Sequence, residues 1–135
     1  MIGRLFSQTQ AVIAAGTAVS GAVYIGGELV AIQLPSGWTA ASMTFAVSFD
    51  GVTYYQLQDA SGNTVTIPSG ALPTGAAAQI ALSTSTAAYG TTGPAISPID
   101  FRGAQFVKIQ SGTSGSPVNQ VSAITLNLIV RRHFA

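Results

Sequence analysis

The chain has 135 residues, a length that fits one domain with a single sizeable core. It has no cysteine, which excludes disulfides, thiolate metal sites and cysteine nucleophiles. Only 7% of its residues are charged, where about 25% is usual, and its net charge of +1 is too small for nucleic-acid binding.

The first 20 residues are expected to form an N-terminal arm or a first strand, and residues 21–135 to form a single β-sandwich domain. Residues 11–14 are the first short strand candidate. The start of the chain only faintly resembles a signal peptide, because polar residues 7–10 interrupt its apolar run. No apolar run reaches the ~18 residues of a membrane span, so we expect no membrane partner.

Two strands are predicted next, a short one over residues 22–25 and a stronger one over residues 28–34 that Pro35-Ser36-Gly37 ends. Trp38 follows in a loop and has two possible roles. An exposed tryptophan can stack on a sugar ring or anchor an interface. We favour the other role, a plug at one end of the sandwich, because a lone tryptophan in a small β domain is usually well buried.

A hairpin is the clearest element of the sequence, over residues 42–57. Apolar residues at alternate positions are expected to share one face: Met43, Phe45, Val47 and Phe49. The dipeptide Asp50-Gly51 predicts a tight turn, and residues 52–57 form the returning strand. Adjacent strand residues face opposite ways, so only one of Tyr54 and Tyr55 can point inward.

Shorter strands are predicted over residues 64–67 and 78–82, and at most one helical turn over 71–82 because Pro73 and Gly75 interrupt that stretch. Residues 83–98 form a long loop that is either a contact element or an excursion from the domain. Residues 105–110 are apolar on both faces, which predicts a central or bridging strand. The last strand, residues 121–131, presents a fully apolar face to the core: Ile124, Leu126, Leu128 and Val130.

Short strands at roughly ten-residue spacing, separated by turns, predict an all-β fold. We expect a two-sheet antiparallel β-sandwich of jelly-roll type, with an extended N-terminal arm and long loops. The sequence leaves the order of the strands open.

The sequence contains few residues that could carry out catalysis. The one histidine, His133, lies two residues from the end of the chain, where a catalytic geometry is hard to hold. The four carboxylates are Glu28, Asp50, Asp59 and Asp100, and their spacing singles out no pair. Residues 59–63 contain one carboxylate, too few for a calcium loop. We therefore expect a protein that is not an enzyme, with no catalytic, cofactor or metal site.

Two segments resemble the discoidin-like, or galactose-binding-like, jelly rolls. Residues 45–54 resemble the family's hairpin of a strand, Ser-x-Asp-Gly and an aromatic residue. Residues 103–109, Gly-Ala-Gln-Phe-Val-Lys-Ile, resemble the strand in which that family carries Ala-Arg-Tyr-Ile-Arg-Ile, with Gln105 in place of the arginine. The resemblance implies the jelly-roll fold. The sugar-binding loops of the family have no counterpart here.

The whole chain also resembles small structural proteins of tailed bacteriophages, in its Ala/Thr/Ser/Gly-rich composition, its lack of cysteine and the stretch Ser-Gly-Thr-Ser-Gly-Ser-Pro-Val-Asn-Gln at residues 111–120. This resemblance implies a virion location, on the capsid surface or an appendage. The implied function is a capsid decoration or cement protein that stabilises the phage head. The alternative is a carbohydrate-binding or fibre- or spike-base module of a tail or head appendage.

A surface with few charges favours close packing against other proteins, since few charges must be desolvated. The other reading is a soluble domain that is polar but uncharged. The expected partners are the major capsid protein or other virion proteins, further copies of the chain (a trimer is favoured) and, in the alternative, a glycan. Nucleic acid is not expected. The candidate interface residues are Arg4, Phe6, Trp38, Tyr55, Arg131 and Arg132.

Overall fold

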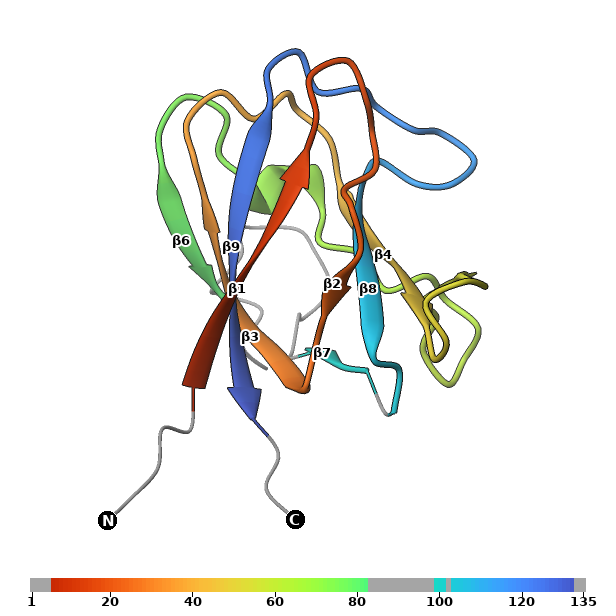
Figure 1. Ribbon diagram of the computed structural model, residues 1–135. Coiled ribbons are helices and arrows are strands. Elements are labelled where there is room, and N and C mark those ends of the chain that lie inside the picture. The colour runs from red at the N-terminus through yellow and green to blue at the C-terminus, as the bar shows by residue number, and fades with distance from the viewer. Residues whose placement is uncertain (1–5, 83–98, 102, 133–135) are drawn as a thin grey trace, which may run out of the picture.

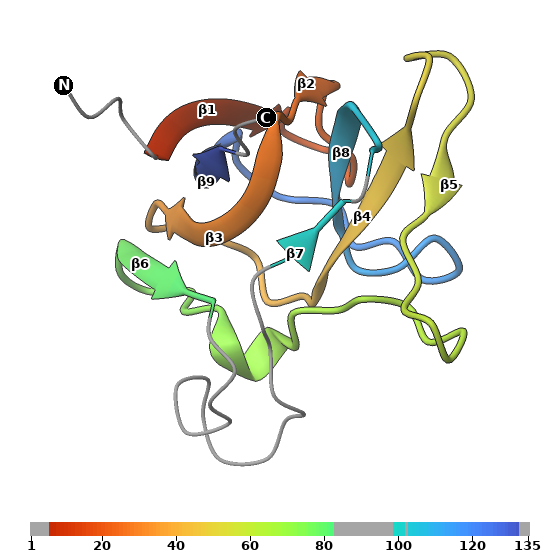
Figure 2. The same ribbon diagram turned by 90° about the horizontal axis from the view of Figure 1, so that it is seen from below.

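The protein folds as two antiparallel sheets packed face to face, in a computed structural model that describes residues 6–82, 99–101 and 103–132 (Figures 1 and 2). The five-stranded sheet contains β1 (Phe6–Ile13), β9 (Ile124–Arg132), β3 (Gly27–Leu34), β6 (Ala78–Ala81) and β7 (Ile99–Asp100). The four-stranded sheet contains β2 (Val23–Tyr24), β8 (Phe106–Ser111), β4 (Met43–Ser48) and β5 (Tyr55–Gln56). The predicted two-sheet β-sandwich is confirmed.

The strand order is that of a jelly roll. The sheets run β1-β9-β3-β6 and β2-β8-β4-β5, with β7 paired to β3, and every pairing is antiparallel. The chain passes from one sheet to the other between β1, β2, β3 and β4, so neighbours in sequence lie in opposite sheets. The last strand, β9, inserts between β1 and β3, which ties the two ends of the chain into one sheet (Figure 1).

The core lies between the sheets and is filled by the inward faces of the strands. The predicted apolar face of β9 is confirmed, because its alternate residues from Ile124 to Val130 are at most 3% exposed. Strand β8 is central in its sheet, as its apolar pattern predicts, and it buries Val107 and Ile109 against the core. Phe45 and Phe101 meet edge to face, with ring centroids 6.1 Å apart.

Residues 6–13 are the first strand rather than a free arm. They pair with β9 along their whole length, from Phe6 opposite Arg131 to Ile13 opposite Ile124. Alternate residues Ala11 and Ile13 are buried in the core. Residues 1–5 lie outside the described part of the chain.

The hairpin prediction is correct in its pairing and in the place of its turn, where Gly51 has a φ of 77°, but the connection is longer than the predicted tight turn. Strand β4 ends at Ser48, and β5 pairs with it only through Tyr55 and Gln56. The Ser48 hydroxyl accepts a hydrogen bond from the Gly51 amide at 2.9 Å, which turns the chain before Phe49 can continue the strand. Phe49 is therefore 70% exposed instead of facing the core.

Other local predictions differ by a few residues. The single helical turn is a short 3-10 helix at Ser69–Ala71, just before the stretch in which it is expected. Residues 64–67 form no strand but make isolated bridges, one from Thr64 to Gln58 and one from Ile67 to Met43. The long loop expected at residues 83–98 lies outside the described residues.

Candidate functional site

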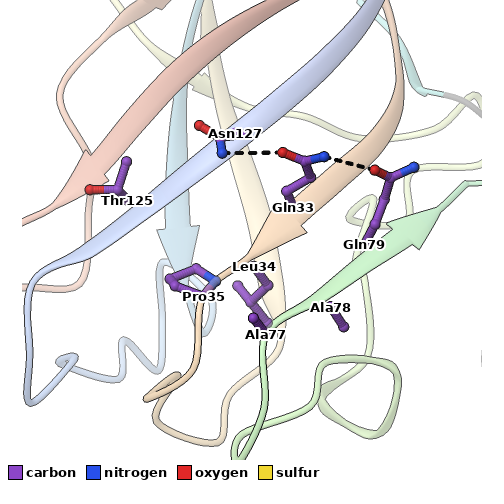
Figure 3. A pocket seen from close by; sticks show the side chains of 8 residues that line it. All are labelled: Gln33, Leu34, Pro35, Ala77, Ala78, Gln79, Thr125 and Asn127. Carbon is purple, nitrogen blue, oxygen red and sulfur yellow. Dashed lines mark hydrogen bonds between the residues drawn. The ribbon is translucent and has the colours of Figure 1, made fainter.

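A row of four side-chain amides crosses the outer face of the five-stranded sheet. Gln10 on β1 donates to Asn127 Oδ1 on β9 at 2.9 Å, and Asn127 donates to Gln33 Oε1 on β3 at 3.2 Å. Gln33 in turn donates to Gln79 Oε1 on β6 at 2.8 Å (Figure 3). We call these four residues the amide ladder.

The ladder follows from strand periodicity and register. Gln33 and Asn127 are each flanked in their own strands by buried apolar neighbours, such as Ile32 and Leu34 around Gln33, so their side chains must point to the outer face. The register then places Gln10, Asn127, Gln33 and Gln79 directly opposite one another in adjacent strands. Each interior amide donates to one neighbour and accepts from the other, so the row holds itself in place without any charged group.

A shallow hollow of about 400 Å³ lies at one end of this face, beside the ladder. Three ladder amides and the hydroxyl residue Thr125 form its polar part (Figure 3). Its apolar part consists of Leu34, Pro35, Ala77 and Ala78. None of the described residues that line it is charged, so it suits neutral hydrogen-bonding groups next to apolar ones, as a protein surface presents, rather than phosphates or carboxylates.

The other end of the same face carries an ion pair. Glu28 on β3 and Arg131 on β9 are cross-strand neighbours, and the guanidinium of Arg131 contacts the Glu28 carboxylate. Phe6 lies opposite Arg131 on the other side and is 51% exposed. The structure thus brings two of the candidate interface residues, Phe6 and Arg131, together on one face, where Glu28 compensates the charge of Arg131.

Trp38 and Tyr55 do not join this face. Trp38 as an interface residue is wrong: it is 1% exposed in the core, and its indole N–H donates to the Ala41 carbonyl at 3.3 Å. Tyr55 is 69% exposed but belongs to the four-stranded sheet. Arg132 pairs with Gly27 through its strand backbone, and its side chain, like Arg4, lies outside the described set.

Neither of the two adjacent tyrosines belongs to the buried core. Tyr54 is half-buried, and the ammonium of Lys108 lies 4.3 Å from its ring centre. Tyr55 pairs with Val47 in the register and is 69% exposed. The outer face of the four-stranded sheet therefore holds one cation on an aromatic ring, in contrast with the neutral amide ladder.

Two of the carboxylates, Asp50 and Asp59, stabilise the turns in which they lie by accepting hydrogen bonds. Asp50 Oδ1 accepts hydrogen bonds from the Thr53 and Val52 amides and from the Ser48 hydroxyl, and these bonds lower its pKa. Asp59 accepts hydrogen bonds from the amides of Asn63 and Ser61, which lower its pKa in the same way. Both groups are thereby held ionised as structural acceptors.

Within the described ranges, no group of three or more histidines, cysteines or acidic residues is placed to hold a metal ion. The same ranges contain no helix of the length and apolarity that crossing a bilayer takes. His133 and the side chain of Asp100 lie outside the described set. No family model matches the chain, and comparison with curated proteins and with solved structures finds no similar one.

The sequence alone does not reveal the amide ladder. Each of its members is a Gln or Asn at an outward-facing strand position, which reads as an ordinary solvent-facing residue. Only the strand order and register show that the four residues are neighbours.

Proposed function

We propose that this protein is a non-enzymatic structural component of a virion, which docks onto a protein shell as a decoration or cement protein. The observation that supports this proposal is the amide ladder with its uncharged hollow. Together they form a regular, neutral sheet face next to a compensated ion pair. The resemblance of the composition and of residues 111–120 to small tailed-phage structural proteins supports the virion assignment.

The energetics of docking favour such a face. Covering an unpaired charge or an unsatisfied amide costs free energy, because its bonds to water are lost. The ladder amides already bond to one another, so a partner can cover them while they keep these bonds. Their remaining donors and acceptors point away from the sheet, where backbone groups of a partner protein can meet them.

The test places a charge in the centre of the ladder. Heads purified without this protein are mixed with the wild-type chain or with the Gln33→Lys variant and sedimented. We expect the wild-type chain to sediment with the heads and Gln33→Lys to bind about tenfold more weakly or worse, since the buried ammonium has no partner.

The matched control is Gln58→Lys, which makes the same charge change on an exposed residue of the loop after β5. It should bind heads as the wild-type chain does. Failure of the wild-type chain to bind heads, or an equal loss in both variants, would contradict the proposal.

A carbohydrate-binding module is the second candidate, and one observation favours it. Tyr55 is exposed on an edge strand, where a sugar ring can stack on it. Trp38, the other aromatic considered for this role, is buried. Glycan-array binding that is lost in Tyr55→Ala but kept in Gln33→Lys would favour this candidate over shell docking.

A further inference from the structure

We infer that the outer edge of β1 is a self-association site, at which the same strand of a second copy adds antiparallel about a two-fold axis near Gln8. The two five-stranded sheets then join into one continuous sheet. The inference deepens the proposed function and rests on it in one respect, because the joined sheets present two docking faces to a shell.

The hydrogen-bond pattern of β1 identifies its open groups. The Val12 carbonyl accepts a hydrogen bond from the Gly21 amide at 3.4 Å, so the backbone groups of Val12 point away from β9. In an antiparallel strand the backbone N–H and C=O of alternate residues point to the same side. Gln10, Gln8 and Phe6 therefore also direct their backbone groups to the outer edge.

This edge lacks the protection that sheet edges usually have. Native edges are guarded by charges, prolines, bulges or short length. Strand β1 has eight residues, Phe-Ser-Gln-Thr-Gln-Ala-Val-Ile, with no charge and no proline, and its register with β9 is unbroken. Within the described ranges, no strand pairs with its outer side.

The residue types of the β1 edge suit pairing with β1 of a second copy. Two-fold pairing brings like residues close together, which is unfavourable for charged strands and costs nothing for a neutral one. A register centred on Gln8 uses every open residue, with Phe6 of each copy opposite Gln10 of the other. It also covers part of the exposed Phe6 ring.

The amide ladder also supports the β1 edge as the self-association site. Gln10 is the end of the ladder, and its Nε2 donates to Asn127. A second copy that adds at this edge can supply a donor to Gln10 Oε1. Joining two sheets at this edge gives one wide neutral face with two hollows, and two-site attachment strengthens binding to a repetitive shell by avidity.

The first experiment measures association of the full chain by sedimentation velocity over a range of concentrations. We expect a monomer–dimer equilibrium for the wild-type chain. Gln8→Lys places like charges opposite each other at the axis and should weaken the dimer about tenfold. Gln79→Lys, the same change at the far edge of the sheet, should leave it unchanged. A monomer at all concentrations, a trimer, or an equal effect of both variants would overturn the inference.

The second experiment traps the pair covalently, in a chain that has no cysteine of its own. Residues in a hydrogen-bonded antiparallel pair have Cα atoms about 5.5 Å apart, within the range of a disulfide. Mild oxidation should therefore cross-link Gln8→Cys as a dimer, while Gln79→Cys should remain uncross-linked. Equal cross-linking of both variants would show random collision and contradict the inference.

The two proposals fail separately in these measurements. A chain that forms the Gln8-dependent dimer but does not sediment with heads contradicts the proposed function alone. A chain that sediments with heads but stays monomeric contradicts the self-association alone.

Discussion

The side chain of Gln120 is hydrogen-bonded to both backbone groups of Thr39. Its Oε1 accepts from the Thr39 amide at 2.7 Å, and its Nε2 donates to the Thr39 carbonyl at 3.1 Å. The same Nε2 donates to the Ser111 hydroxyl at 2.7 Å, and the Gln120 backbone bonds to Gly16 and Thr17. This fully buried amide therefore joins three loops at one end of the sandwich.

We predict that Gln120→Leu lowers the free energy of unfolding by about 2–4 kcal/mol, because it removes the partners of the part-buried backbone groups of Thr39 and of the buried Ser111 hydroxyl. Chemical denaturation measures the loss. The neighbouring exposed residue supplies the control, since Asn119→Ala should change stability by no more than about 0.5 kcal/mol. Equal effects of the two substitutions would contradict the role of Gln120.

Trp38 is the only tryptophan, so its fluorescence reports directly on its environment. We predict a blue-shifted emission in the native protein, unaffected by added glycans, and a red shift on unfolding, because the indole is buried. Trp38→Ala should cost about 3–5 kcal/mol of stability through the cavity that it leaves. Native emission at the wavelength of the unfolded chain would contradict the buried placement.

Acid should weaken the loop between β4 and β5. The pKa of Asp50 is lowered below its ordinary value of 3.8 in the folded protein, first by the Thr53 amide and then by the Val52 amide. A group with a lowered folded pKa stabilises the protein above its unfolded pKa and loses that contribution as the pH falls through the folded pKa. Thermal unfolding should therefore show a decline below about pH 4 that is shallower in Asp50→Asn. An identical acid profile in the variant would contradict this.

Gly112 has a backbone conformation that other residues rarely adopt, with a φ of 82°. A Cβ atom there would meet the Ser116 carbonyl oxygen and lie 2.9 Å from the Val118 amide nitrogen. We predict that Gly112→Ala destabilises the protein by about 2 kcal/mol or more. Gly75→Ala is the matched control, because a Cβ there meets nothing within 4 Å, and its stability should be equal or slightly higher. Denaturant midpoints of both variants decide the question.

The sequence predicted those parts of the fold that depend on local periodicity. Alternation from Ile124 to Val130 identified β9 and its buried face, because successive residues of a strand lie on opposite faces of the sheet. The exposure of Phe49 was missed, since it depends on a hydrogen bond from the Gly51 amide to the Ser48 hydroxyl that no pattern of apolar residues encodes.

The candidate site was beyond prediction for a different reason. Gln10 and Asn127 are 117 positions apart in the chain, and Gln33 and Gln79 are 46 apart. Their contacts depend on the order of the strands, which the sequence left open. Among the expected interface residues whose side chains the structure describes, Phe6 and Arg131 alone lie on the candidate face. Interface residues were sought among aromatic and charged side chains, while the site is built mainly from amides.

The pairing of β1 with β9 has a mechanical consequence. Phe6 begins the first strand and lies opposite Arg131, near the end of the last one, so the start of β1 and the end of β9 lie at the same end of the sandwich (Figure 1). A force that pulls these ends apart breaks the hydrogen bonds between β1 and β9 one after another from this end. It does not load all of these bonds together in shear. Tension through the termini should therefore peel β1 away at low load, whereas load applied through the broad sheet face leaves that seam intact.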